Sequence, residues 1–116
     1  MSFVFPQSWI GPAVAAAVAS FGSIDVSPIR VIYRDLPGQR LGEARPPRTI
    51  VIDRRPDVEW PRNKAQCVIA HEYGHLAGFR DETNDADHTH SDNPRSLMYP
   101  ILTFQICQRW LARHGL

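Results

Sequence analysis

The sequence predicts one small α+β domain, in which three main helices accompany a small twisted mixed sheet. Three observations predict this class. Residues 29–35 and 48–55 are rich in β-branched side chains, as strands are. Three other stretches have the composition or the apolar periodicity of helices. The length of 116 residues, 43 % of them hydrophobic, fits a single domain spanning residues 1–116 with one core.

The first helix is expected from Gly11 to Phe21. Pro12 lies near its start, where the missing N–H of proline is tolerated, and the alanine-rich run behind it favours helix. Residues 2–22 share some apolar character with a secretory signal, but they lack a basic region, and their apolar run is far shorter than the roughly 20 residues of a membrane span. We interpret the segment as a structural helix of a soluble protein whose compartment stays open, the cytoplasm included.

Two strands are expected at 29–35 and 48–55, and the sequence D-L-P-G after the first is typical of a turn. The segment 39–44 between them could add a third strand at an edge of the sheet. The second helix is expected from Pro61 or Asn63 to Ala77, and Gly78 ends it because glycine adopts the left-handed conformation after a helix without penalty.

The last helix is expected from about Thr103 to His114, after a polar loop at 80–95. It carries one of the two cysteines, Cys107, while Cys67 lies on the second helix. Two cysteines can form one bridge but not a disulfide framework. A bridge and two buried free thiols both stay open, and we favour the thiols because free cysteine is among the most buried residue types.

The charge balance argues against one class of protein. The formal net charge is +1, and the basic residues are scattered along the chain rather than gathered in a run. Proteins that bind nucleic acid concentrate positive charge on one patch or stripe. We therefore expect no nucleic-acid partner, no membrane partner and a monomeric chain.

The second helix contains the sequence H-E-Y-G-H, which is typical of hydrolytic zinc sites. His71 and His75 are four residues apart, so they lie about 40° and about 6 Å apart on a helix and can reach one ion. Glu72 is offset by about 100° from His71 and is near enough to take a proton from a water at that ion. The pattern predicts two metal ligands and one catalytic carboxylate.

The residues after this motif offer candidates for a third ligand. Gly78 allows the chain to leave the helix and double back, so that Asp81, three residues later, can approach the same ion. His88 and His90 lie in the polar loop and remain alternatives, since nitrogen is a common zinc ligand. We favour Asp81, because a ligand at His88 would leave the turn at Gly78 unexplained.

These residues, together with S-L-M-Y-P at 96–100, resemble the metzincin zinc metallopeptidases. The methionine turn is similar to that of the matrixins, and an aspartate as third ligand is similar to the snapalysin-type bacterial peptidases. The resemblance implies a zincin-like fold with Zn²⁺ as the metal and Glu72 as general base. The ligands that it implies are His71, His75 and Asp81. Met98 would form the hydrophobic floor of the site, and Tyr99, Pro100 and Ile101 one wall of the pocket for the substrate side chain after the scissile bond.

The expected function is that of a zinc endopeptidase whose peptide or protein substrate pairs with an edge strand, either 39–44 or 49–53. Two other functions stay open. One is a metal-dependent RNA hydrolase that resembles the ribosomal-RNA maturation endoribonucleases, although those proteins lack a glutamate after the first histidine and lack the S-L-M-Y-P turn. The other is an inactive zinc-binding module that binds a protein partner.

Overall fold

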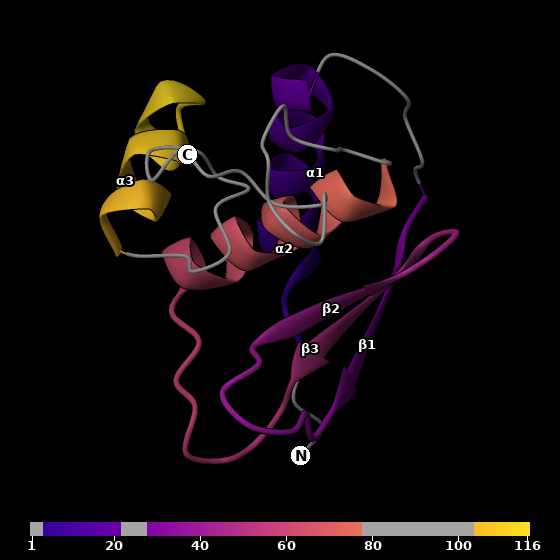
Figure 1. Ribbon diagram of the computed structural model, residues 1–116. Coiled ribbons are helices and arrows are strands. Elements are labelled where there is room, and N and C mark those ends of the chain that lie inside the picture. Colours follow the sequence, from indigo (N-terminus) through magenta and orange to yellow (C-terminus); the bar gives the residue numbers. More distant parts are fainter. Residues whose placement is uncertain (1–3, 22–27, 78–103) are drawn as a thin grey trace, which may run out of the picture.

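In the computed structural model, helix α2 (Arg62–Leu76) packs against one side of a small sheet and carries helices α1 (Gln7–Phe21) and α3 (Phe104–Arg113) against it (Figure 1). The structure describes residues 4–21, 28–77 and 104–116. The strands are β1 (Arg30–Arg34), β2 (Gly42–Arg45) and β3 (Thr49–Asp53). The predicted α+β class with three helices and a small mixed sheet is confirmed.

Helix α1 begins at Gln7 rather than at Gly11, so the predicted start was wrong. The carbonyl of Pro6 accepts a hydrogen bond from the N–H of Ile10 at 3.3 Å, which opens the first turn directly after that proline. Pro12 therefore lies inside the helix instead of at its start. The additional turn contributes Ile10, which is buried, to the core, and this burial offsets the hydrogen bond that Pro12 cannot make.

The sheet has the order β1-β3-β2, with β1 parallel and β2 antiparallel to β3. The third strand expected at the edge is present, but it lies at residues 42–45 rather than 39–44. Because β3 is the central strand, its backbone is paired on both sides. The expectation that an extended peptide could pair with residues 49–53 was therefore wrong, and of the two candidate segments only the one that forms β2 lies at an edge.

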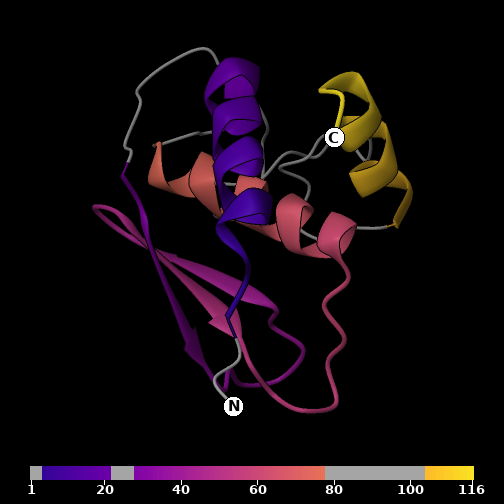
Figure 2. The same cartoon turned by 180° about the vertical axis from the view of Figure 1, so that it is seen from behind.

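Helix α2 lies at the centre of the molecule and contacts α1, α3, β2 and β3. Seen from behind, α1 lies across α2, with α3 on the other side (Figure 2). Its residues from Ala65 to Gly74 are all buried, so the polar side chains among them are held inside the fold. These polar side chains are Gln66, His71 and Glu72.

A disulfide between Cys67 and Cys107 joins α2 to α3. The preference for two free thiols was therefore wrong. The two helices pack so that the Cα atoms lie 5.5 Å apart, which is within the range that a disulfide spans. The burial statistics of cysteine contain no information about this approach, because it depends on how two distant helices meet.

In the described ranges the longest helices have 15 residues, and none of the helices there has the length and apolar character needed to cross a bilayer.

Candidate metal centre

The two histidines of the motif lie one helical turn apart on α2, as predicted. Their ring centroids are 5.0 Å apart, and the rings are nearly perpendicular, at 79°. His71 is buried and His75 is half-buried. The described part of α2 runs without interruption through both residues, so the helical repeat alone sets their spacing.

The donor atoms of His71, Glu72 and His75 all lie within 4.8 Å of one another. Ligand atoms around one tetrahedral zinc ion, each about 2.1 Å from it, lie about 3.4 Å apart. Small side-chain rotations are therefore enough to bring two imidazole nitrogens onto one ion. Imidazole nitrogen and carboxylate oxygen are both ordinary zinc ligands, so the residues present fit this metal.

Glu72 is only 8 % exposed and lies between α2 and the edge strand β2. Its carboxylate accepts a hydrogen bond from the backbone N–H of Ala44. Burial raises the pKa of Glu72 to about 7, against an ordinary value of 4.5, while the positive charge of Arg40 and the Ala44 N–H oppose the rise. A carboxyl with this pKa can both accept and donate a proton near neutral pH.

The backbone of β2 approaches α2 most closely at Gly42. A Cβ placed on this glycine would lie 2.8 Å from Cγ1 of Val68 and 3.2 Å from Oε2 of Glu72. A real Cβ would overlap with these atoms, so the strand comes this near only because residue 42 has no side chain. Sequence reasoning missed this role, because the only signal was a glycine within a short strand.

The outer edge of β2 faces the same region as Glu72. The carbonyl of Leu41 accepts a hydrogen bond from the N–H of Asp53 at 3.0 Å, and hydrogen-bonded pairs alternate along an antiparallel ladder. Gly42 and Ala44 therefore turn their backbone groups away from β3. The Ala44 N–H meets Glu72 on that side.

Several predicted site residues lie outside the described residues. The favoured third ligand and its two alternatives are among them, and so are the turn glycine, the methionine turn and the expected pocket wall. These residues are Gly78, Asp81, His88, His90, Met98, Tyr99, Pro100 and Ile101. Their roles stay predictions.

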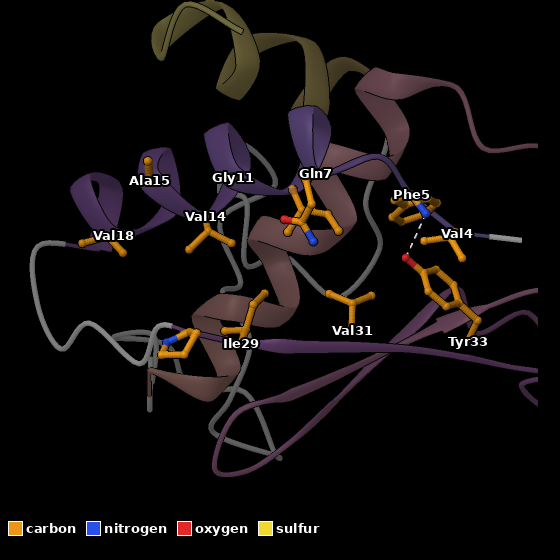
Figure 3. A pocket seen from close by; sticks show the side chains of 12 residues that line it. Val4, Phe5, Gln7, Gly11, Val14, Ala15, Val18, Ile29, Val31 and Tyr33 are labelled. Atoms are coloured by element: carbon orange, nitrogen blue, oxygen red, sulfur yellow. Dashed lines mark hydrogen bonds between the residues drawn. The ribbon is translucent and has the colours of Figure 1, made fainter.

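An apolar groove of about 630 Å³ lies between α1 and β1, apart from the histidines (Figure 3). Val14 and Val18 of α1 and Val31 of β1 point into it. At one end the hydroxyl of Tyr33 accepts a hydrogen bond from the N–H of Phe5 at 2.9 Å. None of the groove's lining residues belongs to the His71 group, so the groove is separate from the candidate metal centre.

Comparison of the chain with protein-family models, with curated proteins and with solved structures finds no match. The functional argument therefore rests on the geometry around α2 and on the sequence motif.

Proposed function

We propose that this chain is a zinc-dependent endopeptidase with a metzincin-like active site on α2. The observation that carries the proposal is the grouping of two imidazoles and one buried carboxylate within 4.8 Å. In this proposal His71 and His75 hold the ion, together with Asp81 from the segment after the helix. When bound, Zn²⁺ supplies a Lewis acid that polarises a carbonyl and activates water.

Glu72 is the general base and acid of this proposal. Its pKa of about 7 and its burial support the role, because a base is most effective when its pKa lies near the working pH. The hydrogen bond from the Ala44 N–H fixes the orientation of the carboxylate. Glu72 would take a proton from the attacking water and pass it to the leaving amine.

The outer edge of β2 is the proposed binding edge for an extended substrate. The backbone groups of Gly42 and Ala44 point to that edge, and peptides commonly add a strand to such an edge. The neighbouring carboxylate of Glu72 would then lie beside the peptide bond that is cleaved. Substrate selectivity would come from side chains at alternate positions of the peptide, since these point to the same face.

A peptide-library cleavage assay with zinc analysis tests the proposal. Wild-type protein should retain one zinc ion per chain and cleave internal peptide bonds, and a chelator should abolish both properties. Glu72→Ala should keep the zinc and lose cleavage by a factor of at least 10², as for loss of a general base. Glu59→Ala is the matched control, because Glu59 is an exposed glutamate in the loop before α2.

The same assay separates the other functions. Asp81→Ala should lose zinc if Asp81 is the third ligand, whereas full zinc occupancy would move that role to His88 or His90. Cleavage of RNA but not of peptides would replace the proposal with a metal-dependent RNA hydrolase. Tight zinc binding with no hydrolysis of either substrate would identify an inactive binding module.

A further inference from the structure

A second buried carboxylate lies outside the metal group, at the end of the central strand. Asp53 is the last residue of β3, and its side chain is fully buried. Its Oδ1 accepts hydrogen bonds from the N–H groups of Leu36 and Arg55, at 3.1 and 3.2 Å. Its Oδ2 accepts a hydrogen bond from Nε of Arg55 at 2.7 Å. Burial alone would raise the pKa of Asp53, but these hydrogen bonds and the Arg55 charge hold it below its ordinary value of 3.8.

Arg55 extends this arrangement along the connection between β1 and β2. One terminal nitrogen of its guanidinium donates to the carbonyl of Gly38, and the other donates to the carbonyl of Arg40 at 3.4 Å. With the bond from Asp53 to Leu36, the connection is fastened near its start, its middle and its end. We call Asp53 and Arg55 the loop clamp.

The clamped connection leads directly into the part of β2 that contacts the candidate base. Gly42 follows the connection, and its backbone lies against Val68 and Glu72 with no room for a Cβ. Ala44, two residues later, donates its N–H to the Glu72 carboxylate. A shift of the loop would therefore move this hydrogen bond and the orientation of Glu72 with it.

A stability argument alone does not explain the loop clamp. Buried ion pairs are often no more stabilising than apolar side chains of the same volume. An apolar pair, however, could not hold the backbone groups of Leu36, Gly38 and Arg40 in fixed positions. The loop clamp therefore contributes a defined loop geometry rather than merely filled volume.

We propose that Asp53 and Arg55 are positioning residues of the active site, which set the orientation of Glu72 through the backbone of β2. This inference rests on the proposed function. The two residues contact neither His71 nor His75 among the interactions described above, so their effect should fall on turnover and not on metal binding.

The test compares Arg55→Ala and Arg55→Lys with the matched control Arg54→Ala. Arg54 is the neighbouring arginine, and its ion pair with Asp35, at 3.4 Å, lies on the surface. In zinc-loaded protein, Arg55→Ala should lower kcat by about 10-fold to 100-fold, the loss expected when a catalytic group is misplaced by up to about 1 Å. KM and zinc content should change little. Arg55→Lys should lie between the wild type and Arg55→Ala, and Arg54→Ala should match the wild type.

Hydrogen exchange at residues 42–44 provides a measurement that does not depend on activity. Arg55→Ala should increase exchange of the Ala44 amide while amides of α2 stay protected, and Arg54→Ala should not. If Ala44 exchange rises but kcat per zinc ion is unchanged, the loop clamp is only structural and the inference is wrong. Unchanged exchange and unchanged kcat in a folded Arg55→Ala would also overturn it. Failure of the proposed function would instead appear as full cleavage by Glu72→Ala, and the exchange result would still hold.

Discussion

Oε2 of Glu72 lies 3.2 Å from the position that a Cβ on Gly42 would occupy. This contact brings the edge strand against the helix that carries the histidines. It predicts that Gly42→Ala is destabilising, because the new methyl group would also lie 2.8 Å from Cγ1 of Val68. We expect a loss of about 1–3 kcal/mol in the free energy of unfolding, as for overpacked cores, and reduced cleavage with zinc retained.

Gly11→Ala is the matched control for this substitution. Gly11 lies in α1, and a Cβ there would meet nothing within 4 Å. Because alanine favours helix over glycine by about 1 kcal/mol, this variant should be as stable as the wild type or more so. Equal stability of Gly42→Ala and the wild type in chemical denaturation would show that β2 does not approach α2 as described.

The raised pKa of Glu72 predicts a pH-dependent cost in the zinc-free protein. The unfolded chain loses this proton near pH 4.5, whereas the folded chain keeps it up to about pH 7. The folded state therefore binds more protons in this window, and its stability falls as the pH rises through it. A change from 4.5 to about 7 corresponds to about 3 kcal/mol.

Glu72→Gln removes this cost. The glutamine variant should match the wild type below pH 4.5 and should be more stable above pH 7, by up to about 3 kcal/mol. Urea denaturation of metal-free protein at several pH values measures the difference. A difference between the two proteins that does not change from pH 4 to pH 8 would contradict the burial of this carboxyl.

Asp53 should show the opposite pH dependence. Its pKa is held below the ordinary 3.8, so the stability that it contributes is present above that value and is lost as the pH falls through the lowered pKa. Asp53→Asn should therefore be less stable than the wild type at pH 7, by about 3 kcal/mol as for a broken buried pair. Thermal unfolding should show the two proteins converging near pH 2, and a constant gap would contradict this role of the charge.

The Cys67–Cys107 disulfide closes a loop of 40 residues between α2 and α3. Loops of this length give about 2–4 kcal/mol of stabilisation. A reductant, or the double substitution Cys67→Ser and Cys107→Ser, should lower Tm by about 10 °C. The double variant should not respond to the reductant, and titration of two free thiols in untreated protein would contradict the bridge.

The sequence predicted the helices best, because their signals are local. The spacing of His71 and His75 follows from the helical repeat, and α2 and α3 lie within one or two residues of their expected bounds. The start of α1 was missed because Pro12 favours a first turn, whereas burial of Ile10 favours an earlier start. Local propensity lost to tertiary packing there.

The parts that could not be predicted depend on contacts between distant segments. Nothing in the run T-I-V-I-D shows that its strand is central, because the sheet order depends on how β2 returns beside it. The Cys67–Cys107 bridge and the approach of Gly42 to Glu72 likewise depend on helix and strand placement. The motif predicted which residues carry the chemistry, whereas the fold determines what holds Glu72 in position.

The most direct test of the account is the cleavage rate of Glu72→Gln compared with the wild type at equal zinc occupancy. Glutamine keeps the shape of the side chain and can accept the Ala44 hydrogen bond, but it cannot take a proton. The account predicts one zinc ion per chain in both proteins and a loss of cleavage of at least about 10² in the variant. Wild-type cleavage by a zinc-loaded Glu72→Gln would contradict it.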